Sequence, residues 1–142
     1  MAWNQVRSSL GRALILGFGM VCAGAAHAQW ILIASTAVYE IYGDRLSIER
    51  RGHQASSIYL YDFRQVQSPE RGAFRSSKLL REFDCHARNA RMVSISEYMD
   101  PMGRGPQVNS FYTDLPWEPV KSGGALDAQW QFACNDDPVH RN

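Results

Sequence analysis

The 142-residue chain lacks a strong excess of either charge, because 15 lysine and arginine residues face 14 acidic residues, for a formal net charge of +1. Such a balance predicts neither general nucleic-acid binding nor adhesion to acidic membranes. The chain also lacks internal repeats and low-complexity segments, so nothing predicts a repeat architecture. Cysteine is scarce, at three residues, which excludes a disulfide-dense scaffold.

Charge is nearly missing from the first 39 residues, and no apolar run is long. Arg7 and Arg12 are the only charged side chains before Glu40, and both precede the apolar stretch 13–26. That stretch falls short of the roughly 20 residues that a transmembrane helix needs, so a cleavable secretory signal is favoured over a retained anchor.

The predicted signal peptide covers residues 1–28. Ala26 and Ala28 place small residues at the −3 and −1 positions of the cleavage site, so the exported chain begins at Gln29. A lipoprotein signal at Cys22 is less favoured, because the residues before this cysteine depart from the usual lipidation pattern. No membrane span is expected after cleavage.

Cleavage removes Cys22 and leaves Cys85 and Cys134 as a pair. An even number of cysteines in an oxidising compartment predicts one disulfide. Closing a loop of this length would stabilise a small domain by about 4 kcal/mol. The remaining segment, residues 29–142, is long enough for one modest core and too short for two, so one domain is expected.

The exported segment has an uneven charge distribution although its total is close to zero. Segment 64–104 carries 8 basic and 5 acidic residues, whereas segment 114–142 carries 2 basic and 5 acidic residues. The basic middle could favour a polyanion such as a glycosaminoglycan, but at this charge density an ordinary solvated surface is favoured.

The exported segment is predicted to be rich in β-strands. Strands are expected where β-branched and aromatic residues gather between turn signals. Gly43-Asp44 should end one of them, polar turns are expected at 49–52 and 100–106, and a longer loop at 67–77. The predicted strands are 30–33, 37–42, 57–63, 78–91, 92–99 and 107–112.

A C-terminal helix is predicted after the loop 118–124. Leu126, Trp130, Ala133 and Cys134 recur at helical spacing, and Asp127 lies near the positive N-terminal end. If Trp130 and Cys134 face the core, the disulfide fastens this helix to the sheet through Cys85.

Several polar sets could suggest an enzyme, and each has a simpler structural explanation. Glu82, Asp84 and His86 would share one face of a strand, as a metal or acid–base set does, but any solvent-facing strand shows the same alternation. The neighbours Cys85 and His86 would point to opposite faces, which argues against an activated thiol. Neither an enzyme, a cofactor nor a metal site is therefore predicted.

Tyr59, Tyr61 and Phe63 would share one face of the strand 57–63. They could form a stacking platform for sugar or single-stranded nucleic acid. An exported protein rarely meets nucleic acid, so packing of this face against the C-terminal helix is favoured.

A distinctive set of residues recurs in order over nearly all of the exported segment: Trp30, Tyr42-Gly43-Asp44, Ser47-Ile48, Tyr59–Phe63, Ser76-Ser77-Lys78, Arg88, Arg91, Tyr98, Met102-Gly103-Arg104-Gly105, Trp117 and Trp130–Cys134. The most specific part is Glu82-Phe83-Asp84-Cys85 followed by a second cysteine soon after a late tryptophan. In their order and spacing these residues resemble the surface-adhesin protein E family of small exported Gram-negative proteins.

The resemblance implies an α+β fold, with an antiparallel β-sheet of about five to six strands, a C-terminal helix packed on it and the Cys85–Cys134 bridge. It also implies adhesion to host extracellular-matrix components, and the surface loops are where such binding is expected. Arg71, Arg75 and Arg104 lie in or beside these loops and are the candidate contacts for a polyanionic ligand. A periplasmic structural or accessory protein without a host ligand is the alternative.

Overall fold

The computed structural model describes residues 28–135, which form one antiparallel β-sheet and a C-terminal helix. The predicted signal peptide, apart from Ala28, lies outside the described residues, together with the alternatives at Cys22. Within 28–135, no helix is long and apolar enough to cross a membrane.

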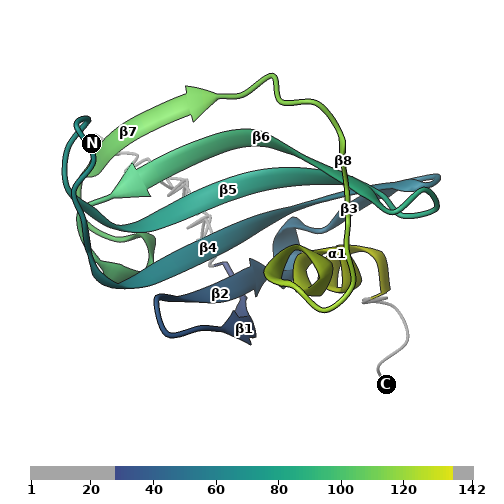
Figure 1. Cartoon of the computed structure of the whole chain (residues 1–142), viewed down its shortest axis with the longest axis horizontal. Helices are drawn as coiled ribbons and strands as arrows, with labels where there is room; N and C mark the ends of the chain where they lie inside the picture. Colours follow the sequence, from purple (N-terminus) through teal and green to yellow (C-terminus); the bar gives the residue numbers. More distant parts are fainter. Residues whose placement is uncertain (1–27, 136–142) are drawn as a thin grey trace, which may run out of the picture.

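The sheet has the strand order β1-β2-β4-β5-β6-β7, so β1 and β7 are its two edges (Figure 1). Two short strands extend it, since β3 pairs with β4 and β8 pairs with β6. The predicted fold class, an antiparallel sheet with a helix packed on it, is confirmed. The strands are β1 Trp30–Ser35, β2 Tyr39–Asp44, β3 Glu49–Arg51, β4 Gln54–Gln67, β5 Phe74–Asp84, β6 Asn89–Tyr98, β7 Gln107–Tyr112 and β8 Glu118–Pro119.

Three 3₁₀ or α-helical segments accompany the sheet: η1 Arg45–Ser47, η2 Pro101–Gly103 and α1 Ala125–Asn135. Helix α1 crosses one face of the sheet (Figure 1). Its Phe132 and Ala133 pack with Ile41, Tyr59 and Phe83 of the sheet to form the buried core. The face that α1 covers is called the helix face below, and the opposite face is called the open face.

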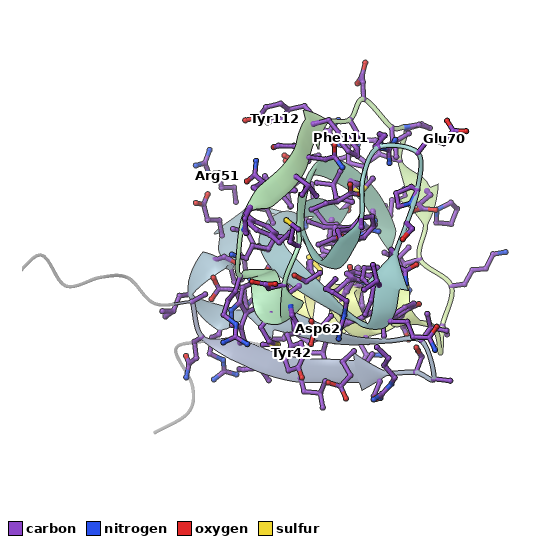
Figure 2. The ribbon with its side chains drawn as sticks, turned by 90° about the vertical axis from the view of Figure 1, so that its left-hand side faces the viewer. Tyr42, Arg51, Asp62, Glu70, Phe111 and Tyr112 are labelled. Atoms are coloured by element: carbon purple, nitrogen blue, oxygen red, sulfur yellow. A yellow bond between two sulfur atoms is a disulfide. The ribbon has the colours of Figure 1, made fainter. Side chains whose placement is uncertain are left out.

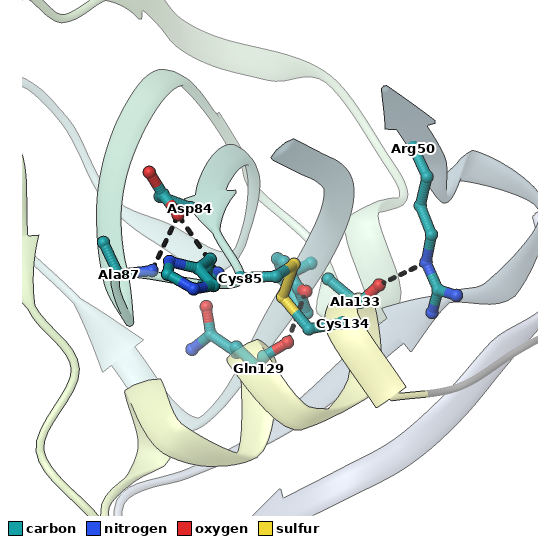
Figure 3. The surroundings of a disulfide bond; sticks show 9 residues. Arg50, Asp84, Cys85, Ala87, Gln129, Ala133 and Cys134 are labelled. Atoms are coloured by element: carbon teal, nitrogen blue, oxygen red, sulfur yellow. Dashed lines mark hydrogen bonds between the residues drawn. A yellow bond between two sulfur atoms is a disulfide. The ribbon is translucent and has the colours of Figure 1, made fainter. Parts of the chain in front are cut away.

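Two hydrogen bonds and the disulfide reinforce the contact between α1 and the sheet. Tyr59 donates its hydroxyl hydrogen to the carbonyl oxygen of Gln129 at 2.8 Å, and Gln129 Nε2 donates to the Tyr61 hydroxyl at 2.5 Å. The predicted packing of these tyrosines against the helix is therefore confirmed. The Cys85–Cys134 bridge is also confirmed, and it joins the end of β5 to the last turn of α1 (Figure 3).

The predicted strand 78–91 is right for residues 78–84, which belong to β5, but wrong in its continuity, because the chain turns at 85–88 before β6 begins. Asp84 Oδ1 accepts hydrogen bonds from the backbone N–H groups of His86 and Ala87, and Arg88 adopts a positive φ of 53°. This turn has no glycine or proline to mark it. A side-chain cap takes the place of the usual turn residues.

The predicted loop 67–77 is too long, since β5 begins at Phe74 and only 68–73 connects the strands. Ser76 and Ser77 are buried, and the Ser76 hydroxyl donates to the carbonyl oxygen of Asp100 at 2.6 Å. Hydrogen bonding of this kind lets a polar serine lie inside a strand, although the composition of segment 67–77 alone favours a loop. The predicted polar turn 49–52 is likewise partly strand, because β3 occupies Glu49–Arg51.

The second strand ends at Gly43 and Asp44 as predicted, and these two residues are the last of β2. A Cβ atom at position 43 would lie 2.6 Å from Cζ of Phe132, so glycine is needed where the helix ring approaches the strand. Asp44 then caps η1 by accepting a hydrogen bond from the backbone N–H of Leu46. The strand Gln107–Tyr112 and the C-terminal helix are confirmed.

Candidate functional site

The open face of strands β5, β6 and β7 carries a lysine surrounded by hydroxyl groups. Strand register places Lys78 beside Ser96 and Ser96 beside Ser110, so these three side chains form one row across the three strands. The next row consists of Leu80, Ser94 and Tyr112. Ser96 and Ser110 hydroxyls are 3.1 Å apart and hydrogen-bonded.

These side chains face away from α1 because residues alternate between the two faces of a strand. Tyr59 on the helix face pairs with Leu79, so Lys78 and Leu80 point to the open face. Tyr112, at the end of edge strand β7, is 86% exposed. Figure 2 shows it projecting from the sheet into solvent.

Lys78 is positioned by an aromatic ring and by η2. Its Nζ lies 4.8 Å from the ring centroid of Tyr98, within cation–π distance. A Cβ atom at Gly103 would lie 3.0 Å from the same Nζ, so the lysine runs close along the backbone of η2. Gly103 also has a φ of 64°, which an L-residue with a side chain rarely adopts.

Arg104 follows Gly103 directly and is exposed. Its Nε donates to the carbonyl oxygen of Pro101 at 3.3 Å, which holds the base of the side chain near η2. Within residues 28–135, no carboxylate forms an ion pair with Lys78 or Arg104. Lys78 lies in the first hydroxyl row, and Arg104 directly follows Gly103, beside which Lys78 Nζ lies. We call Lys78, Arg104, Ser96, Ser110 and Tyr112 the cationic hydroxyl face.

η2 is fixed on the open face by hydrogen bonds to the sheet. Asp62 Oδ1 accepts from the backbone N–H of Met102 at 2.8 Å, and Ser76 Oγ accepts from that of Gly103 at 2.8 Å. Met102 has a positive φ of 60°, so the turn is held in an uncommon backbone conformation. These bonds fix the position from which Arg104 extends.

The three arginines predicted as ligand contacts do not form a single cluster. Arg71 lies on the helix face, where its guanidinium carbon is 5.1 Å from the ring centroid of Phe111 and its Nη2 is 3.9 Å from Glu97 Oε1. Arg75 is partly buried, and its Nε donates to the carbonyl oxygen of Phe63 at 3.2 Å. Arg104 lies across the sheet from Arg71, beside the open face.

Lys78 is a candidate contact that the sequence interpretation missed. Strand alternation in β5 could have identified it, because a strand that buries Leu79 directs its neighbour Lys78 to the opposite face. What the sequence could not show is that η2, which lies more than 20 residues later in the chain, brings Arg104 to the same place.

Ion pairs neutralise most of the other arginines in the basic segment 64–104. Arg91 binds Glu82 at 2.6 Å, Arg88 binds Asp127 at 2.8 Å, and Arg81 lies 3.9 Å from Glu118. Arg91 also stacks on the ring of Trp117, and Arg88 on that of Trp130. The net excess of positive charge in this segment is consequently concentrated in the few cations that lack such partners.

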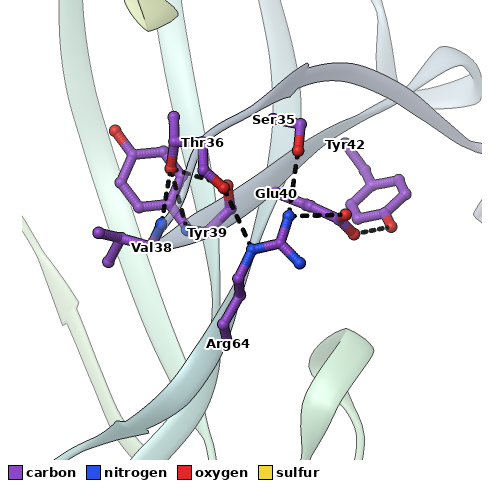
Figure 4. A network of polar contacts seen from close by, with 7 residues as sticks. All are labelled: Ser35, Thr36, Val38, Tyr39, Glu40, Tyr42 and Arg64. Carbon is purple, nitrogen blue, oxygen red and sulfur yellow. Dashed lines mark hydrogen bonds and ion pairs between the residues drawn. The ribbon is translucent and has the colours of Figure 1, made fainter.

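A second polar network lies at the other edge of the sheet and has a structural explanation (Figure 4). Arg64 bonds Glu40 Oε1 and the Ser35 hydroxyl, and the Tyr42 hydroxyl donates to Glu40 Oε2 at 2.7 Å. The bond to Glu40 raises the pKa of Tyr42 above its ordinary value, so this phenol stays protonated. These contacts tie β1, β2 and β4 together.

The tyrosines on the helix face are neutral core residues. Burial raises the pKa of Tyr59 and of Tyr61. Both hydroxyls are engaged with Gln129, so neither ring is available as a stacking platform for a ligand.

The acid–base set suggested by the sequence is dispersed in the structure. Glu82 is paired with Arg91, Asp84 caps the turn after β5, and Cys85 is in the disulfide (Figure 3). Among residues 28–135 there is no group of three or more His, Cys, Asp or Glu side chains that could hold a metal ion.

Comparison with known proteins gives a family for this fold and site. Residues 30–135 match the family model described as surface-adhesin protein E. The chain belongs to the surface-adhesin protein E family. This finding confirms the resemblance seen in the sequence, and the matched segment contains both halves of the disulfide and the whole cationic hydroxyl face.

Solved structures of protein E from Haemophilus influenzae share the fold. One superposes with a TM-score of 0.57 at 15% identity, covering 78% of this chain and 87% of that chain. A second crystal form gives a TM-score of 0.54 at 14% identity, covering 78% and 97%. Protein E from non-typeable Haemophilus influenzae gives 0.51 at 14% identity, covering 77% and 86%. No curated protein shows a significant sequence match.

Proposed function

We propose that this chain is an exported, non-enzymatic binding module of adhesin type that contacts host extracellular-matrix components. Family membership supports the adhesin-like role. The signal-like segment 1–28 supports export, with cleavage before Gln29, to the periplasm or the outer surface of a Gram-negative cell. The remaining segment, 29–142, is the binding domain.

The observation that carries the binding proposal is the cationic hydroxyl face. Lys78 and Arg104 supply positive charge that no described carboxylate neutralises by an ion pair, while serine hydroxyls and exposed Tyr112 flank them. Sulfates and carboxylates of a glycosaminoglycan would bind the cations, and sugar hydroxyls would bond the serines. Arg71 and Arg75 are proposed as further contacts for ligands that extend around the loop end of the sheet.

The alternative is a periplasmic structural or accessory protein that has no host ligand. The ion pairs of Arg81, Arg88 and Arg91 favour it, because they use three of the eight basic residues of segment 64–104 inside the fold. The two functions differ in whether the isolated domain binds matrix components at all.

Binding of the purified protein to heparin and to immobilised matrix proteins distinguishes these functions. We expect wild-type binding that weakens as salt rises, and at least about a tenfold loss in the Lys78→Glu/Arg104→Glu variant, as for paired charge contacts. Lys121→Glu is the matched control, because it reverses an exposed lysine outside the face.

The outcomes separate the two parts of the proposal. Unchanged binding in the double variant would show that the ligand uses another surface, such as that around Arg71. Absence of wild-type binding to every matrix component would support the accessory role. Thermal unfolding of each variant confirms that it is folded.

A further inference from the structure

Two histidines from separate turns lie side by side at one end of the sheet. His53 is in the turn between β3 and β4, and His86 is in the turn between β5 and β6. Because Gln54 pairs with Asp84 at the matching ends of β4 and β5, the two turns meet. The imidazole centroids are 5.3 Å apart with an angle of 49° between the rings, and both side chains are exposed.

The backbone around both histidines is fixed. The N–H of Cys85 donates to the carbonyl oxygen of His53 at 2.8 Å, which joins the two turns directly. Asp84 Oδ1 accepts from the N–H of His86 at 3.1 Å, and the disulfide attaches Cys85 to α1. The two turns that carry the histidines are thus held together before any ligand arrives, which lowers the entropic cost of binding.

We propose that His53 and His86 together bind one divalent transition-metal ion of the kind that prefers imidazole, such as Zn²⁺, Cu²⁺ or Ni²⁺. With metal–nitrogen distances of about 2.0–2.1 Å and tetrahedral geometry, two imidazole centroids on one ion lie about 5 Å apart. The observed separation of 5.3 Å is close to that value, so the two rings are spaced as imidazoles that share one ion are spaced.

The site has two protein ligands, so a bound metal ion should exchange with solution. The nearby carboxylates are engaged, since Glu82 is paired with Arg91 and Asp84 caps the turn. Among the described residues no third ligand of the same kind completes the set. Water would fill the remaining positions, and a ligand from a bound partner could replace it.

Metal binding at this pair should stabilise the fold. The two histidines are 33 positions apart in the sequence and come together only when β4 and β5 are paired. An ion that binds the folded state and not the separated turns raises the melting temperature, and the rise grows with the logarithm of the ratio of ion concentration to Kd. This inference does not depend on the proposed matrix binding.

The test uses the tag-free protein recovered after export. Titration calorimetry and thermal unfolding with Zn²⁺ and with Cu²⁺ are compared for wild type, His53→Gln, His86→Gln and the double variant. His140→Gln is the control, because it removes a histidine outside the described residues.

We expect saturable binding of one ion and a higher melting temperature in the wild type and in His140→Gln. Each single variant should bind at least about tenfold more weakly, and the double variant should lose the effect. Equal binding by the double variant, or no wild-type binding at millimolar metal, would overturn the proposal. The two histidines would then be neighbouring surface rings without a metal-binding role. The metal-free melting temperatures should match, since both side chains are exposed, and this verifies folding.

Discussion

The hydroxyl of Tyr59, buried in the middle of β4, donates a 2.8 Å hydrogen bond to the carbonyl oxygen of Gln129 in α1. Gln129 is itself fully buried and bonds the neighbouring Tyr61 hydroxyl. The helix is therefore positioned by polar contacts within the core as well as by apolar packing and the disulfide. Buried hydrogen bonds of this kind favour one orientation of the helix on the sheet, while Gln129 Oε1 is buried without a hydrogen-bond partner.

Tyr59→Phe should lower the free energy of unfolding by about 1–2 kcal/mol, because it removes the bond and leaves a buried carbonyl with one partner fewer. Urea unfolding measures the loss. Tyr112→Phe removes the same atom from an 86% exposed ring and serves as the control, with no expected change. Equal stability of the two variants would contradict the role assigned to the Tyr59 hydroxyl.

Gly43→Ala should destabilise the protein by about 1–3 kcal/mol through overpacking. The added methyl group would lie 2.6 Å from Cζ of Phe132, so the helix or the ring must move. Gly124→Ala is the matched control, because no atom lies within 4 Å of a Cβ there. Thermal or urea unfolding distinguishes the two, and a harmless Gly43→Ala would show that the helix–strand contact is loose.

Asp127 should make stability depend on acid pH. Hydrogen bonds from the Gly123 backbone N–H, then from Arg88 and Gln131, hold the pKa of this carboxyl below its ordinary value of 3.8. The unfolded chain lacks these bonds and so binds a proton at higher pH. The stabilisation is complete above about pH 4 and is lost as pH falls through the folded-state pKa.

The measurement compares wild type with Asp127→Asn in urea at pH 6 and at successively lower pH. The stability difference between them should be largest at pH 6 and should shrink in acid. Asp114→Asn, an exposed site, controls for the change in net charge. A difference that stays constant down to pH 2 would contradict the assignment to Asp127.

Local patterns were sufficient for part of the fold. The strand Gln107–Tyr112 and the helix Ala125–Asn135 follow from residue type and periodicity within short windows. The disulfide followed from the predicted signal cleavage, which leaves two cysteines in an oxidising compartment. These features depend on neighbouring residues or on composition, which a sequence shows directly.

Other features depend on contacts between distant segments. From the sequence, Gly43 is read as a turn residue. In the structure, glycine is needed there because the ring of Phe132, 89 residues later, leaves no room for a Cβ atom. The turn after Asp84 carries no glycine or proline and depends on a side-chain cap. Lys78 and Arg104, like His53 and His86, become neighbours only through the strand pairing, so no local pattern could identify either pair as a site.

The proposed function requires that the protein is exported as a domain closed by the Cys85–Cys134 disulfide. Intact mass spectrometry of the protein recovered from a Gram-negative host, with thiol alkylation before and after reduction, tests this requirement directly. We expect a chain that begins at Gln29 and takes up no alkylating reagent until it is reduced, and then two equivalents. A retained N-terminus, or two freely alkylated thiols before reduction, would contradict the export assignment and the adhesin-type function that depends on it.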